Sequence, residues 1–238
     1  HPYRALAAFI AGGVLSAAAS GCEREEPTPA APPAAASGPA RAIPPTKAYT
    51  NLVADEVGTL PDGIGLTVGT AVPDVSLSDS EGHQVSLRDL ASRGSLLVIF
   101  YRGGWCPFCN FQIRELTAAF PEFRQRGVTP IAISVDRVEE AAKTSATYEI
   151  PFPVLSDPDL VAHRAFRVLR HADDAEFARL KGMGFDIEAA SGRDHHMIAV
   201  PAAFVVTQSM IRWAHANQDY RARPSVTQLL HALDQMPR

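Results

Sequence analysis

Two cysteines three positions apart, Cys106 and Cys109, are the residues best suited to chemistry in this 238-residue chain. They follow an apolar run, Leu96–Tyr101, which is rich enough for a strand buried on both faces and too short to span a membrane. A pair of glycines then allows a sharp turn, and Pro107 suits the first position of a helix, where its missing N–H is not needed. The pattern predicts a strand, a turn and a helix that begins at the two cysteines.

This placement favours redox chemistry. Side chains at positions i and i+3 of a helix have Cβ atoms about 5–6 Å apart, so Cys106 and Cys109 are able to close a disulfide. The free N–H groups and the positive dipole end of the helix favour a thiolate, the reactive form in disulfide exchange and in peroxide reduction. We expect Cys106, near the N-cap, to be the more exposed and more acidic thiol. Two other interpretations are half of a zinc site and a pair of inert thiols. Zinc usually takes four ligands, and Cys22 is the only further cysteine.

Alternating strand and helix patterns surround this unit and predict the elements that position it. They are a hairpin of 75–77 and 83–85, a helix 87–92 capped by Ser86, a strand 128–135, a helix 137–148, an extended piece 153–155, a helix from Asp157 or Asp159 to Leu169, a helix from Asp173 or Asp174 to Lys181, a polar loop 187–197, a strand pair 203–206 and 210–215, and a last helix from Pro224 or Ser225. Such an order predicts an α/β sandwich with a mixed central sheet flanked by helices, over residues 65–238.

The segment Phe-Tyr-Arg-Gly-Gly-Trp-Cys-Pro-Phe-Cys-Asn, residues 100–110, resembles the peroxiredoxin-like branch of the alkyl hydroperoxide reductase/thiol-specific antioxidant (AhpC/TSA) family, in the thioredoxin-like superfamily. The similarity covers about 65–233 and includes 68–74, 152–158 and 200–206. It implies a thioredoxin-like fold without a cofactor. It also implies a thiol oxidoreductase that cycles Cys106 and Cys109 between dithiol and disulfide, reduces peroxides or protein disulfides, and draws electrons from a thiol reductant.

The resemblance leaves the roles of the two sulfurs open. On the peroxiredoxin pattern, Cys106 replaces a threonine and Cys109 is the peroxidatic cysteine; on the thioredoxin pattern, Cys106 attacks and Cys109 resolves. Pro201 takes the place of the arginine that peroxiredoxins carry before their penultimate strand. Val200-Pro201-Ala202 looks instead like the thioredoxin cis-proline turn, which slightly favours disulfide reduction. An ordinary trans proline at the start of a strand is the alternative.

Other side chains could support this site. Arg102 either stabilises a thiolate or is solvated, and Trp105 either shields the sulfurs or simply packs. His195 and His196 could join the two cysteines in a copper or zinc site, so a metal carrier of thioredoxin fold is the alternative function. The polar stretch 217–223 offers no chemistry that the sequence alone assigns.

The N-terminal part has the composition of an export segment. Residues 1–22 hold one arginine before an apolar, alanine-rich stretch and end in Ala19-Ser20-Gly21-Cys22, which resembles a bacterial lipoprotein cleavage site with Cys22 lipidated. Ordinary cleavage after Ala19 is the alternative. Residues 23–47 contain seven prolines and predict an extended linker, followed by a short segment at 48–64 with a helix near Leu52. We therefore expect an exported protein of the bacterial periplasm, anchored to the membrane by lipid.

The charge balance is nearly even, with 22 basic and 26 acidic residues. This balance gives no basic face for nucleic acid and no acidic tail.

Overall fold

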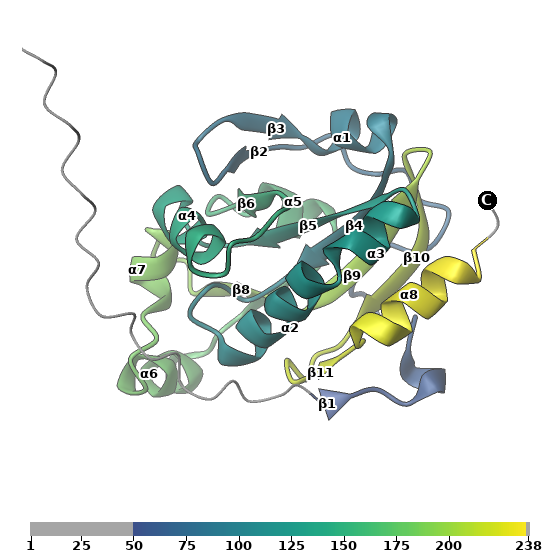
Figure 1. Ribbon diagram of the computed structural model, residues 1–238. Coiled ribbons are helices and arrows are strands. Elements are labelled where there is room, and N and C mark those ends of the chain that lie inside the picture. The colour runs from purple at the N-terminus through teal and green to yellow at the C-terminus, as the bar shows by residue number, and fades with distance from the viewer. Residues whose placement is uncertain (1–49, 237–238) are drawn as a thin grey trace, which may run out of the picture. The chain divides into compact units, whose positions relative to one another are not determined.

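The computed structural model describes residues 50–236. The predicted signal peptide, linker and lipidation site at Cys22 lie outside these residues. Within the described part, a mixed sheet of seven strands has the order β10-β9-β4-β5-β6-β2-β3 (Figure 1). Its strands are β2 (Ser76–Asp79), β3 (Gln84–Ser86), β4 (Ser95–Phe100), β5 (Val128–Ser134), β6 (Val154–Ser156), β9 (Ala202–Thr207) and β10 (Met210–Ala216).

The central strand β4 pairs in parallel with β5 and antiparallel with β9. This pairing confirms the buried strand predicted from the apolar run, since every residue of Leu96–Phe100 is buried. Two smaller sheets lie beside the main one. They are β1 (Thr50–Asn51) paired in parallel with β11 (Ala222–Arg223), and β7 (Leu169–His171) paired antiparallel with β8 (Met197–Ala199).

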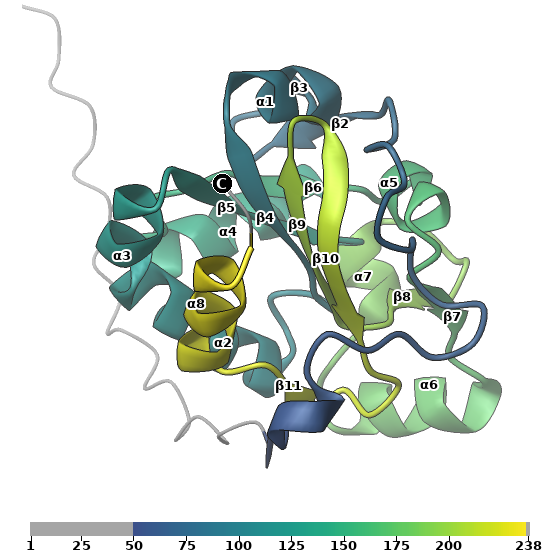
Figure 2. The same cartoon turned by 90° about the vertical axis from the view of Figure 1, so that its right-hand side faces the viewer.

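Helices cover both faces of the sheet (Figures 1 and 2). One face packs against α2 (Pro107–Ala118), α3 (Phe120–Gln125), α4 (Val138–Thr147) and α8 (Val226–Asp234). The other face packs against α1 (Leu87–Arg93) and α5 (Val161–Ala165). The remaining helices are α6 (Asp174–Gly182), α7 (Ile187–Ser191) and a short 3-10 helix, η1 (Ala54–Glu56). The predicted α/β sandwich with a mixed sheet is confirmed. No helix in the described range is both long and apolar enough to cross a membrane.

Local signals in the sequence placed most helix starts correctly. Ser86 and Asp173 accept hydrogen bonds from the N–H groups of Asp89 and Glu176, and so cap α1 and α6 as predicted. Ser225 and Gln228 form a reciprocal capping box at the start of α8.

Two predicted elements were wrong. The helix expected to run to Leu169 ends at Ala165, because Arg167 takes a left-handed conformation and Leu169 then enters β7. The stretch 187–197, expected to be a polar loop, contains α7, which is capped by Asp186 and ends at Gly192, and the first residue of β8. Since β7 and β8 pair with each other, both errors concern one small sheet whose strands need a distant partner.

Candidate active site

The turn after β4 delivers both cysteines to the start of α2. Cys106 is the N-cap residue, and its carbonyl accepts the first helical hydrogen bond, from Asn110, at 3.0 Å. Pro107 occupies the first helical position, and Cys109 lies in the first turn, as predicted. The described backbone thus brings the two cysteines together at the positive end of a helix dipole.

Both cysteines are free thiols and both are buried, with 1% of Cys106 and none of Cys109 exposed. The prediction that Cys106 is the exposed, acidic thiol is therefore wrong. Burial raises the pKa of Cys106 well above its usual value, and a hydrogen bond to the sulfur of Cys109 raises it further. Burial opposes the thiolate at Cys109 too, but the hydrogen bond from Cys106 and the charges of Arg223 and Arg102 lower its pKa to about 6. Cys109 is the thiolate of the pair.

Arg223 supplies the closest cation to this thiolate. Its Nη2 donates to the Sγ atom of Cys109 at 3.2 Å, its Nη1 to Oε1 of Gln112 at 2.7 Å, and its Nε to the carbonyl of Tyr220 at 2.9 Å. The side chain is 1% exposed. The sequence did not predict this role, because nothing local distinguishes Arg223 from Arg221, which pairs with Asp219 at the surface. Its position depends on β11, which pairs with β1 at the opposite end of the described chain.

Arg102 provides a second buried charge and is not solvated. It is 2% exposed, and its guanidinium lies 4.9 Å from the ring centre of Trp105 and 4.3 Å from that of Tyr220. Its Nη2 also contacts Glu176 on α6 at 3.2 Å, and Arg170 holds that carboxylate with two bonds of 2.6 and 2.7 Å. Trp105 packs on Arg102 and against the buried cluster that holds both cysteines, which leaves both interpretations of this residue open.

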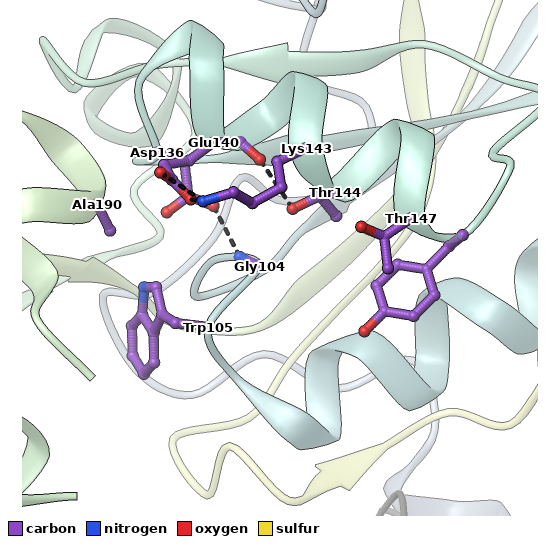
Figure 3. Close-up of a pocket in the computed structure, with 9 residues that line it drawn as sticks. Gly104, Trp105, Asp136, Glu140, Lys143, Thr144, Thr147 and Ala190 are labelled. Carbon is purple, nitrogen blue, oxygen red and sulfur yellow. Dashed lines mark hydrogen bonds and ion pairs between the residues drawn. The ribbon is translucent and has the colours of Figure 1, made fainter. Parts of the chain in front are cut away.

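The glycine turn is fixed by Asp136, the second residue after β5 (Figure 3). Oδ2 of Asp136 accepts the N–H of Gly104 at 2.7 Å and the hydroxyl of Ser134 at 3.0 Å. A side chain on Gly104 would overlap the hydroxyl of Thr144 on α4. Burial raises the pKa of Asp136 to about 7. The role of Asp136 was not predicted, although a polar residue directly after the predicted strand 128–135 is a usable signal.

Pro201 lies between β8 and β9, close to the same centre. It lines a small cavity together with Gln112 and with Arg223, the arginine that donates to Cys109. Its peptide bond is trans, as are the other peptide bonds between residues 50 and 236, so the expected cis-proline turn is wrong. Proline has no N–H to donate to a sheet, and the position just before a strand requires none, which accounts for its place here.

His195 and His196 do not join the cysteines. His195 contacts the carbonyl of Pro158 at 3.1 Å, and His196 contacts Glu188 at 2.8 Å. In the described part of the chain, no three His, Cys, Asp or Glu side chains gather in a way that could hold a metal ion. Both histidines instead tie loops to neighbouring elements.

Fold and site define a thioredoxin-like domain with two buried, free cysteines at the start of a helix, and sequence comparison gives its family. Residues 68–214 match the AhpC/TSA family, and the chain belongs to that family. A probable 1-Cys peroxiredoxin of Syntrichia ruralis is 32% identical over 104 residues, 41% of this chain and 47% of that protein. The thiol-disulfide oxidoreductase ResA of Bacillus cereus is 30% identical over 101 residues, 42% of this chain and 57% of that protein. The chain thus spans about half the length of these relatives.

Solved structures show the same fold. The peroxidoxin BcpB of Mycobacterium tuberculosis has a TM-score of 0.56 at 19% identity, over 74% of this chain and 99% of that one. The PrxQ protein of Xylella fastidiosa has a TM-score of 0.57 at 18% identity, over 72% of this chain and 98% of that one. At these identities the likeness concerns the fold alone.

Proposed function

We propose that this protein is a thiol peroxidase in which Cys109 attacks the peroxide and Cys106 resolves the product. The hydrogen bond from Arg223 to the buried sulfur of Cys109 is the observation that carries this assignment. With a pKa of about 6, roughly nine-tenths of Cys109 is thiolate at pH 7, whereas a thiol at its usual 9.0 is thiolate in only about one molecule in a hundred.

The reaction needs only the two sulfurs, protons from water and a thiol reductant. The Cys109 thiolate attacks one oxygen of the peroxide and the O–O bond breaks, leaving a sulfenic acid and a hydroxide or alkoxide that takes a proton. The Cys106 thiol, already hydrogen-bonded to Cys109, then displaces water from the sulfenic acid and forms the disulfide. A thiol reductant supplies two electrons and two protons to restore both thiols.

Burial favours a small oxidant over a protein disulfide. A disulfide reductase must present its attacking sulfur to a partner protein, yet 1% of Cys106 and none of Cys109 is exposed. Hydrogen peroxide is close to water in size and needs far less opening of the site. This chain has Pro201 where peroxiredoxins carry an arginine. Arg223 can take over the role of that arginine, since it reaches the sulfur from another part of the chain.

Stopped-flow mixing tests the proposal. The reduced protein is mixed with hydrogen peroxide and, separately, with a disulfide-bonded peptide at equal concentration, and the loss of free thiol is followed. We expect oxidation by peroxide to be at least about 100-fold faster, because the thiolate of Cys109 is fully buried and a peptide disulfide cannot come into line with it. Faster reaction with the peptide would overturn the assignment and restore disulfide reduction with Cys106 as the attacking thiol.

We propose further that the protein is exported and lipid-anchored, on the basis of the N-terminal pattern that ends at Cys22. Full-length protein expressed in a bacterium should fractionate with membranes, and Cys22→Ser should release it or leave an unprocessed precursor. Soluble unmodified protein that begins at Ser20 would instead establish ordinary secretion.

A further inference from the structure

The polar stretch 217–223, for which the sequence indicates no chemistry, lies over the first turn of α2 (Figure 2). The ring of Tyr220 packs against that of Phe108, with the ring centres 5.4 Å apart and the planes at 77°. Arg223 donates to the sulfur of Cys109 at 3.2 Å. We call residues 217–223 the cover, because they lie directly on Cys109, none of which is exposed.

The other contacts that hold the cover in place are short. Its strand β11 pairs with β1 over two residues. Asn217 donates its N–H to the carbonyl of Pro201 at 3.2 Å. The ion pair between Arg221 and Asp219 lies within the cover and does not tie it to another element. The attachment of the cover to the helix therefore depends strongly on the guanidinium of Arg223.

Oxidation of the cysteines changes the charge next to this guanidinium. Its three hydrogen bonds go to the sulfur of Cys109, the amide oxygen of Gln112 and the carbonyl oxygen of Tyr220, and of these acceptors only the thiolate is charged. A disulfide with Cys106 removes that negative charge, because both sulfurs become neutral. None of the ion pairs in the described part of the chain includes Arg223, so the cation, 1% exposed, is then buried without a counter-ion.

A buried charge that has lost its partner is strongly destabilising. Arg102 does not meet the same difficulty, because its counter-ion is the carboxylate of Glu176 at 3.2 Å. The smallest movement that returns Arg223 to water is detachment of the cover, since β11 is paired over only two residues whereas α2 packs on the core through buried Ile113 and Leu116.

We propose that the cover is redox-sensitive: the thiolate of Cys109 holds it closed, and formation of the Cys106–Cys109 disulfide releases it, so that a thiol reductant reaches the disulfide. The inference rests on the disulfide of the proposed function. It gives the buried site two states, one closed to large molecules while the cysteines are reduced and one open to the reductant after oxidation. The reductant then supplies two electrons and two protons, and the restored thiolate closes the cover again.

Hydrogen–deuterium exchange of the reduced and oxidised wild-type protein tests the release. Diamide forms the disulfide by removing two electrons and two protons from the thiol pair, so no peroxide is needed. We expect the peptide that spans 217–225 to exchange at least about tenfold faster after oxidation, and peptides from β4 and β5 to be unchanged. Equal exchange of 217–225 in both states would overturn the inference and leave the peroxidase function intact. A protein that forms no Cys106–Cys109 disulfide would refute both.

Two substitutions of the reactive cysteine separate charge from oxidation. Cys109→Asp and Cys109→Asn have side chains of nearly the same shape, and neither can form the disulfide. The aspartate keeps an anion beside Arg223, so 217–225 should exchange as slowly as in the reduced wild type, whereas in Cys109→Asn it should exchange at least about tenfold faster without any oxidant. Equal exchange in the two variants would contradict the inference.

Substitutions of the arginine give the converse test. Arg223→Met removes the buried cation, so oxidation should change the exchange of 217–225 by less than about twofold. Arg221→Met, two positions earlier and at the surface, is the matched control and should keep the tenfold response. A full response in Arg223→Met would overturn the inference. Thermal melts establish folding, and if a variant does not fold, the wild-type comparison decides the question.

Access to the disulfide is tested with one thiol in two sizes. Oxidised wild-type protein is mixed with free cysteine and, separately, with a long peptide that carries a single cysteine, and the return of protein thiols is followed. We expect the two rates to agree within about tenfold, because an open cover admits both. A peptide that reacts more than about tenfold more slowly would show that the disulfide stays covered, and would overturn the inference.

Discussion

Removing the charge of Arg223 should make Cys109 a weaker acid, by an amount that the structure allows to be estimated. The guanidinium donates to the sulfur at 3.2 Å in a fully buried setting. Hydrogen bonds to charged groups contribute about 1.5–3 kcal/mol, or roughly one to two pKa units. Arg223→Met should therefore move the pKa of Cys109 from about 6 to roughly 7–8.

The sign of this shift fixes its dependence on pH. At pH 6 the thiolate fraction should fall about 5- to 50-fold in Arg223→Met, and alkylation of Cys109 by iodoacetamide should slow in proportion. At pH 9 both proteins are almost entirely thiolate, so their rates should converge to within about twofold. The assay is the pH dependence of alkylation, read from the Cys109 peptide by mass spectrometry.

Arg221→Met is the matched control. Arg221 lies two positions earlier, pairs with Asp219 at the surface, and should leave the pKa of Cys109 unchanged. Arg223→Lys should give an intermediate value, since the ammonium keeps the charge but cannot bond to Gln112, Tyr220 and the sulfur together. An Arg223→Met protein in which Cys109 still titrates near pH 6 would refute the reasoning, because Arg102 and the helix dipole would then be sufficient.

Three further predictions concern the surroundings of the site. The pKa of Asp136 is about 7 in the folded protein against a usual 3.8, so its contribution to stability is complete below pH 3.8 and is lost as the pH rises to 7. In Asp136→Asn the free energy of unfolding should fall less over this pH range. The same fall in both proteins, measured by denaturation at several pH values, would contradict this. Gly104→Ala should slow peroxide reduction at least about tenfold by displacing the turn, and adding Thr144→Ala should restore part of the rate; no rescue would argue against the overlap. Asp157→Ala breaks a buried pair with His163 and should lower the free energy of unfolding by about 3 kcal/mol or more. Asp159→Ala, at an exposed position, should lower it by less than about 1 kcal/mol. Equal losses for the two variants in urea titrations would contradict this.

The sequence predicted the parts of the fold that depend on nearby residues. The apolar run of β4, the proline at the start of α2 and the capping residues of α1, α6 and α8 act within a few positions, so pattern and chemistry were enough. The strands β7 and β8 could not be found in this way. Each has three residues, and each is extended because the other pairs with it.

In the site, too, features set by nearby residues could be predicted and features set by distant residues could not. The position of Cys106 and Cys109 at the helix start followed from spacing, but their relative acidity did not. A helix N-terminus alone favours a thiolate at Cys106. The hydrogen bond between the two sulfurs raises the pKa of Cys106 and lowers that of Cys109, and the charges of Arg223 and Arg102 lower the pKa of Cys109 further. Arg223 lies 114 positions from Cys109 in the chain, in a stretch that carries no local signal.

The most direct test of the central claim is to identify the cysteine that peroxide oxidises first. Cys106→Ser and Cys109→Ser proteins are treated briefly with an equimolar amount of hydrogen peroxide, trapped with dimedone and mapped by mass spectrometry. We expect sulfenic acid at Cys109 in Cys106→Ser and no reaction of Cys106 in Cys109→Ser, with an intramolecular disulfide in the wild type. Sulfenic acid at Cys106 in Cys109→Ser, with Cys109 unmodified in Cys106→Ser, would contradict it.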